Sequence, residues 1–153
     1  MKSALPFAAA ALLSFGGAAQ AAGFHLEPFN QAFTGTGQTS ATKNGITLPC
    51  TAKFKGNVDA NGVGHVTSGT FTGQIGCESV TLGNLPWTAT ATAAKKAKIL
   101  NVKFNSPIGA CGPGNLPVRL VNGTISFTNV PLAGGCTVTG KIKTKPKVLI
   151  VPN

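Results

Sequence analysis

The amino-acid sequence predicts an all-β protein with a single antiparallel domain, either a β-sandwich or a barrel-like sheet, that is stapled by disulfide bonds. Short stretches of alternating apolar and polar residues recur from residue 46 onward, which is the pattern of half-buried strands. Turn residues, chiefly Gly, Asn, Asp and Pro, separate these stretches at short intervals. Four cysteines, an even number, lie in the same region. Together these features are typical of a small exported β domain.

Residues 1–21 are predicted to be a signal peptide. Lys2 supplies a short positive region, residues 4–19 are largely apolar, and the Ala-Gln-Ala triplet at 19–21 fits a signal peptidase site. We therefore expect an exported protein that is extracellular, at the cell surface or in the periplasm. No later stretch is long and apolar enough to predict a transmembrane anchor after signal removal.

The rest of the chain is expected to consist of a lead-in segment, 22–45, that ends in a first strand, followed by a β domain, 46–153. Apolar residues at every second position predict the strands of that domain. The strands are expected at 51–58, 65–73, 75–83, 86–94, 98–106, 117–121, 124–128, 136–145 and 147–151. The Ala- and Lys-rich stretch 91–98 has no helix cap and lies between alternating segments, so no helix is expected there.

Local sequence also predicts the sharpest turns. Residues 59–62 read Asp-Ala-Asn-Gly and join two expected strands. Asn122-Gly123 favours a hairpin turn, although with Thr124 it also matches a glycosylation sequon. The Gly-Pro-Gly triplet at 112–114, directly after Cys111, predicts a sharp turn beside a bridged cysteine.

The cysteines are expected to form two disulfide bonds. They are Cys50, Cys77, Cys111 and Cys136, and three pairings are open. A zinc site would be expected to contain a closely spaced cysteine pair, which the sequence lacks. The segments 68–83 and 122–140 echo one another around Cys77 and Cys136, which favours Cys50–Cys77 and Cys111–Cys136 as the pairs. Loop-closure entropy does not decide the pairing, because it also allows longer, crossed loops.

The supply of catalytic groups is small. The chain has 3 Asp+Glu, 2 His and no Tyr, against 13 Lys+Arg, for a net charge of +10. His25 and Glu27 could begin a metal site, but they fit a solvated segment better. His65 and Asp59 are the one pair suited to nucleophilic catalysis, and turn chemistry already accounts for Asp59. We therefore expect no enzyme activity, no metal site and no cofactor.

Lysine is placed regularly on two of the expected strands, so each set projects from one face. The residues are Lys53, Lys55, Lys141, Lys143 and Lys145. They either bind extracellular polyanions or protect exposed strands from aggregation. Because no aromatic residue shares their face, base-stacking recognition of nucleic acid is not expected.

Several short strings together resemble one family of secreted bacterial proteins, the PraB-like protein activators of alkane oxidation. The resemblance covers about residues 30–151 and rests on GITLPC at 45–50, GC at 76–77, LPWT at 85–88, CGPG at 111–114, TISF at 124–127 and GCTV at 135–138. It implies a small extracellular protein that aids growth on water-insoluble hydrocarbon. It implies no catalytic residue.

The sequence therefore favours a non-enzymatic secreted or cell-surface protein that works at interfaces, by assisting the use of hydrocarbon, by adhesion or by association with an extracellular matrix. Its expected partners are hydrophobic interfaces or extracellular polyanions, and self-association is a further expectation. The alternatives are a polyanion-binding module and a fibre subunit that exchanges strands, with the lead-in as donor. The apolar lead-in residues Phe24, Leu26, Phe29 and Phe33 either supply interfacial surface or pack onto the domain.

Overall fold

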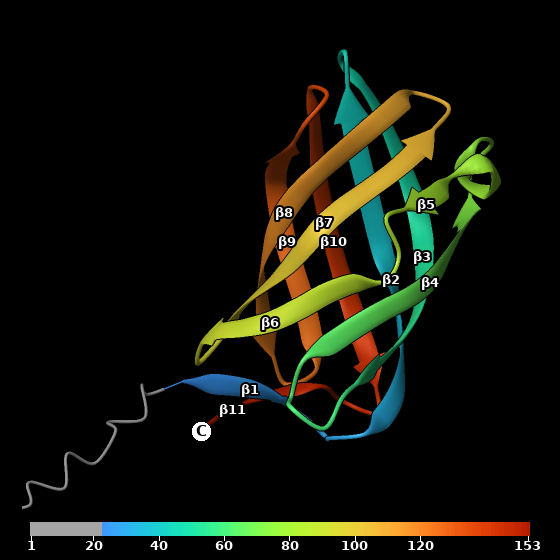
Figure 1. Ribbon diagram of the computed structural model, residues 1–153. Coiled ribbons are helices and arrows are strands. Elements are labelled where there is room, and N and C mark those ends of the chain that lie inside the picture. The colour runs from blue at the N-terminus through green and yellow to red at the C-terminus, as the bar shows by residue number, and fades with distance from the viewer. Residues whose placement is uncertain (1–22) are drawn as a thin grey trace, which may run out of the picture.

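The computed structural model describes residues 23–153, and its main feature is an eight-stranded antiparallel β-barrel (Figure 1). The barrel strands are β2 (Gln31–Lys43), β3 (Ile46–Val58), β4 (Gly64–Gly73), β6 (Trp87–Ala93), β7 (Lys96–Ser106), β8 (Gly109–Val121), β9 (Thr124–Leu132) and β10 (Cys136–Lys145). They follow one another around the barrel in chain order, and β10 closes the barrel by pairing with β2. The predicted all-β fold with two disulfides is thus confirmed, in its barrel form.

Three short elements complete the fold. The 3-10 helix η1 (Cys77–Ser79) and the strand β5 (Thr81–Gly83) lie between β4 and β6 in the chain, and β5 pairs with β7. The strands β1 (Phe24–Glu27) and β11 (Leu149–Pro152) form a two-stranded sheet at one end of the barrel (Figure 1). Residues 23–153 contain no helix with the length and apolar character needed to cross a membrane.

The expected lead-in, 22–45, contains β1 and the whole of β2. β2 is hydrogen-bonded along its length to β3 on one side and β10 on the other, so it is part of the barrel wall. Its inward positions include Gly35, Gly37 and Thr39, which carry too little apolar character to mark a buried strand by pattern alone. The predicted signal peptide, 1–21, lies outside the described residues.

Two local expectations were wrong. The stretch 75–83 is not one strand, because the chain turns through η1 at Cys77, which is bonded to Cys50, and only its last three residues form β5. Residues 112–114 do not form a turn either. They lie within β8, where Gly112 has a φ of +86° and the ladder to β7 is irregular, so the triplet makes a bulge. Asn122-Gly123 does form the predicted hairpin turn between β8 and β9.

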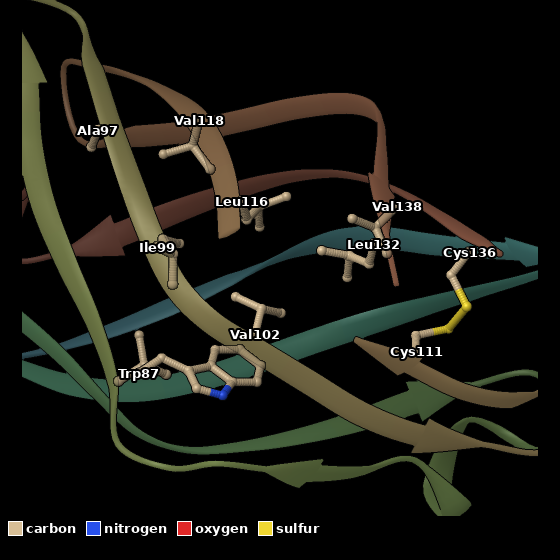
Figure 2. Packing of buried hydrophobic residues seen from close by; sticks show 11 residues of the cluster. Trp87, Ala97, Ile99, Val102, Cys111, Leu116, Val118, Leu132, Cys136 and Val138 are labelled. Atoms are coloured by element: carbon tan, nitrogen blue, oxygen red, sulfur yellow. A yellow bond between two sulfur atoms is a disulfide. The ribbon is translucent and has the colours of Figure 1, made fainter. Parts of the chain in front are cut away.

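Side chains at alternate positions of each strand point inward and fill most of the barrel interior. Figure 2 shows the main cluster of buried residues, which runs from Trp87 to the Cys111–Cys136 disulfide. Several inward glycines make room for aromatic rings: the ring of Phe127 covers Gly140, and a Cβ on Gly56 would lie 2.8 Å from Cζ of Phe33. Gly in a strand thus marks a close approach of another group here, not a weak strand.

A second cluster closes the end of the barrel beneath β1 and β11. Its buried members are Leu26, Val58, Leu120 and Val148, and the half-buried ring of Phe33 packs against them. The backbone N–H of Leu26 also donates to the carbonyl of Gly62, at 2.9 Å. Leu26 and Phe33 therefore pack onto the domain, whereas Phe29 remains 44% exposed.

Candidate functional site

The barrel interior holds two cavities of about 80 Å³ each. The first lies in the half that contains the disulfides, since Leu48, Cys50 and Val138 line it. The second lies in the half covered by β1 and β11, since Leu26 and Val148 line it. The cavities are neighbours, because four residues line both: Phe54, Trp87, Leu116 and Phe127. Eight strands give an interior that side chains nearly fill or that holds one small ligand.

The walls of both cavities carry no charged side chain. Three hydroxyl groups in the first wall are already paired: Thr39 and Ser106 donate to backbone carbonyls at 3.0 and 2.9 Å, and Thr139 bonds Asn129. The fourth hydroxyl residue of this wall, Ser40, is half-buried and occupies an outward position of β2. In the second wall, Thr144 donates to a backbone carbonyl at 2.7 Å. Within residues 23–153, every buried side-chain nitrogen or oxygen has a hydrogen-bond partner. The interior therefore presents a contact surface that is apolar nearly throughout.

Trp87 stands between the two cavities. Its indole Nε1 donates to the carbonyl of Gly83, at 2.7 Å, and the residue is 5% exposed. Its ring is tilted against that of Phe54, with the centroids 6.3 Å apart, and Phe54 meets Phe71 edge-on at 5.7 Å. Because its one polar atom is paired, the indole offers an apolar face to both cavities.

The five lysines predicted from strand parity all lie on one outer face of the barrel, formed by β3, β2 and β10. Thr34 lies opposite both Lys55 and Lys145, and Thr36 lies opposite both Lys53 and Lys143. Because neighbouring strands are about 4.8 Å apart, lysines on either side of β2 are about 10 Å apart. We call Lys53, Lys55, Lys141, Lys143 and Lys145, all exposed, the lysine face.

The acidic residues do not balance this face. The two ion pairs among residues 23–153 both involve histidine: His25 with Glu27, and His65 with Asp59. The lysine face is therefore a region of one sign of charge, which is the arrangement that a polyanion needs.

The histidine pairs hold turns and chain ends together. Asp59 accepts two backbone N–H bonds within its turn, and its second oxygen lies 2.9 Å from Nε2 of His65. The hydrogen bond from His65 lowers the pKa of Asp59. Hydrogen bonds to Glu27 and then to Asn153, at the other end of the described chain, raise the pKa of His25. Within residues 23–153, no group of three or more His, Cys, Asp and Glu residues could hold a metal ion.

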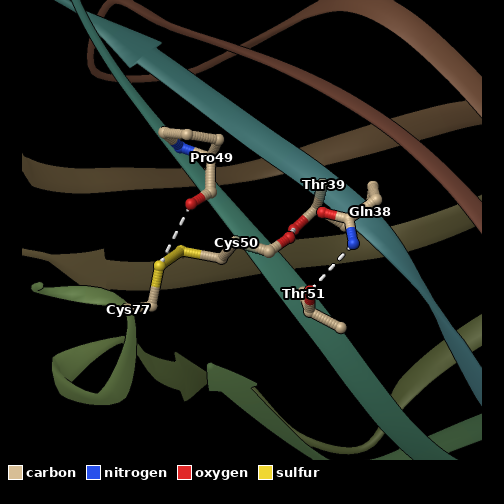
Figure 3. The surroundings of a disulfide bond; sticks show 6 residues. All are labelled: Gln38, Thr39, Pro49, Cys50, Thr51 and Cys77. Atoms are coloured by element: carbon tan, nitrogen blue, oxygen red, sulfur yellow. Dashed lines mark hydrogen bonds between the residues drawn. A yellow bond between two sulfur atoms is a disulfide. The ribbon is translucent and has the colours of Figure 1, made fainter. Parts of the chain in front are cut away.

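Both predicted disulfides are confirmed, as Cys50–Cys77 and Cys111–Cys136. Cys111 and Cys136 belong to the main cluster, whereas Cys50 and Cys77 form a separate small cluster with Leu48. Figure 3 shows the first pair, with Sγ of Cys77 lying 3.2 Å from the carbonyl oxygen of Pro49. This is a close contact only, because a bonded sulfur has no proton to donate. The bond anchors η1 to β3.

The cavities are the feature that sequence reasoning missed. The one signal that points to them is the pairing of aromatic residues with inward glycines, such as Phe127 with Gly140, and it depends on knowing which strands are neighbours.

Comparison with known proteins gives one family match. The family model described as alkane oxidation protein activator, PraA/PraB-like, matches residues 1–152. No curated protein and no solved structure matches the chain significantly.

Proposed function

The chain belongs to the PraA/PraB-like family of alkane oxidation protein activators, and from this premise we propose that it is a non-enzymatic exported protein that helps cells use water-insoluble hydrocarbon. The family is described as an activator, which agrees with an accessory role. In the proposed role, the protein works at the boundary between hydrocarbon and water, before the oxidising enzymes act. The observation that carries this proposal is the apolar surface that isoleucine side chains leave open to solvent at one end of the barrel.

Two exposed isoleucines supply contact with the hydrocarbon phase. Ile75 is fully exposed and Ile46 is 58% exposed. Ile46 is the first residue of β3 and Ile75 lies between β4 and η1, so both are at the disulfide end of the barrel. Because the two most exposed aliphatic side chains lie at this end, they would orient the barrel on an oil surface and place this end in contact with hydrocarbon.

Replacing both isoleucines with serine (Ile46→Ser, Ile75→Ser) is expected to weaken adsorption at an oil–water boundary severalfold, because the apolar contact is lost. The measurement is the interfacial tension of hexadecane against buffer as protein concentration rises. The matched control is Val121→Ser with Leu149→Ser, which removes two residues of 38% and 40% exposure at the opposite end. Failure of the unaltered protein to lower the tension more than an equally charged unrelated protein would remove the interfacial role.

The lysine face supports a second function, the binding of extracellular polyanions. The specific observation is that β2 places two separate lysine rows on one surface, with hydroxyl groups of Thr34 and Thr36 between them. Matrix polysaccharides and released DNA carry the negative charge that such a face would bind. This function is compatible with the first, since the lysine face and the cavities lie on opposite sides of the barrel wall.

Changing Lys141, Lys143 and Lys145 to Gln is expected to reduce polyanion binding and to flatten its salt dependence. With duplex DNA as the probe, each lost phosphate contact lowers the slope of log K against log salt by about 0.9. The control is Lys96→Gln, Lys98→Gln and Lys103→Gln on β7, which lies across the barrel from β2. Equal losses in both triple variants would show that net charge alone matters, and no loss in the first would leave the face as a guard against aggregation.

A further inference from the structure

We propose that the barrel interior is a binding site for the chain of one unbranched alkane, which occupies the two cavities on either side of Trp87. This inference rests on the proposed hydrocarbon role and assigns its ligand and its site. It differs from adsorption at an oil surface, because the hydrocarbon is taken up one molecule at a time inside the barrel. A cavity of about 150 Å³ with apolar walls stays dry and binds benzene. Each cavity here is about 80 Å³, so the two reach that volume only when one ligand occupies both.

The walls select a ligand without a polar head. No charged side chain lines either cavity, and the hydroxyls of Thr39, Ser106, Thr139 and Thr144 are already engaged within the protein. A carboxylate in this interior would lose its hydrogen bonds to water and meet no cation and few free donors in such a wall. An alkane loses nothing of this kind, so the chemistry of the walls favours an alkane over a fatty acid of the same length.

The arrangement of the cavities favours an extended chain. They follow one another along the barrel, one in the disulfide half and one beneath β1 and β11, and the same four side chains separate them. Phe54 and Phe127 in this partition can turn about their side-chain bonds, which would join the two spaces into one channel past the indole of Trp87. A linear chain can extend through such a channel from one space to the other, and it is the narrowest hydrocarbon of a given carbon number.

Two ladders of the barrel wall are only three residues long, β4–β6 and β8–β9, and the seam beside β4 is the one that borders the first cavity on both sides and through which a chain can enter. β4 pairs with β6 only over residues 64–66, and no ladder joins the rest of β4 to β5 among the described residues. Side-chain packing closes this seam: a Cβ on Gly69 would lie 2.7 Å from Cδ1 of Leu82. Phe71 and Leu82, on the two sides of the seam, both line the first cavity. The seam can therefore part without breaking a strand ladder.

Trp87 makes the proposal directly testable, because it is the only tryptophan of the chain. Bromine quenches indole fluorescence on contact, so we expect 1-bromodecane to quench Trp87 and n-decane to reverse the quenching. Apparent affinity should rise about fourfold with each added methylene until the channel is full. Decanoate at neutral pH should compete more than about a hundredfold less well than decane. Absence of quenching at saturating 1-bromodecane, or equal competition by decanoate, would overturn the proposal.

Two substitutions locate the site. Val138→Phe places a ring in the first cavity and should lower 1-bromodecane quenching at least tenfold, whereas Val121→Phe makes the same change at an exposed position and should leave it unaltered. Leu82→Ala opens the seam and should speed the onset of quenching severalfold, which tests the route even if Val138→Phe folds poorly. Equal quenching in Val138→Phe and the unaltered protein would overturn the interior site, and an unaltered rate in Leu82→Ala would overturn the seam as its entrance.

The interfacial tension measurement keeps the two proposals apart. If the protein lowers the tension and 1-bromodecane fails to quench Trp87, the interior site is refuted and the accessory role at interfaces stands. If Trp87 is quenched and the tension is unchanged, the interior site stands and interfacial adsorption is refuted.

Discussion

Replacing Cys111 and Cys136 with alanine is expected to lower the free energy of unfolding by at least about 3.5 kcal/mol. The bond closes a loop with a sequence separation of 25 residues. Without the bond the unfolded chain gains conformational entropy, and the chain-entropy model gives this value for a loop of that length. Both sulfurs lie in the main cluster, with residue exposures of 0% and 1%, so lost packing adds to the effect. A typical domain is stable by about 5–15 kcal/mol, so the loss is a large fraction of the total.

The second disulfide provides a matched control for this prediction. Cys50 and Cys77 close a loop of nearly the same sequence separation, 27 residues. The entropic contributions of the two disulfides to the free energy of unfolding are therefore nearly equal. Their cluster is small and lies at η1, so their replacement should destabilise the fold less than the loss of Cys111–Cys136. Urea unfolding of both double variants measures the difference. A larger loss for the Cys50–Cys77 pair would show that packing in the main cluster contributes little.

The strands that sequence predicted well are those whose inward residues are large and apolar. In β10, Val138 and Ile142 alternate with exposed lysines, and the expected range 136–145 is the one observed. The sequence predicts β2 only as the end of a lead-in segment. Gly35 and Gly37 occupy its inward positions, where aliphatic residues would have indicated a strand. These glycines let the neighbouring strand approach closely. A prediction from apolar periodicity misses them, because glycine has no side chain to add to the pattern.

The candidate sites differ in how far sequence could define them. The alternation of residues along each strand predicted that Lys53, Lys55 and the three lysines of β10 are exposed. This prediction needs only the local sequence, because successive side chains of a strand point to opposite faces. The two lysine sets share one face because β2 lies between β3 and β10. This strand order could not be predicted from the sequence. The cavities depend still more on the tertiary structure, since their walls come from nearly every strand.

Gly37→Ala is expected to destabilise the barrel by about 3 kcal/mol, at the upper end of the usual cost of overpacking. Gly37 lies opposite Ile142, where β2 and β10 close the barrel. A Cβ at this position would overlap the carbonyl oxygen of Lys141, and the Cα of Ile142 would lie 2.9 Å away. Because both are backbone atoms, the two strands themselves must move apart to admit the methyl group.

Gly83→Ala is the matched control, because it adds the same methyl group to another strand. Its nearest neighbours are the flexible methylenes of Lys103, at 3.4 Å, so this variant should lose less than about 1 kcal/mol. Thermal and urea unfolding of the two variants give the comparison, and fluorescence of Trp87 reports whether the barrel stays closed. Equal stability of Gly37→Ala and Gly83→Ala would mean that β2 and β10 are not in close contact at Gly37. The closed barrel, and with it the enclosed apolar interior, would then have to be abandoned.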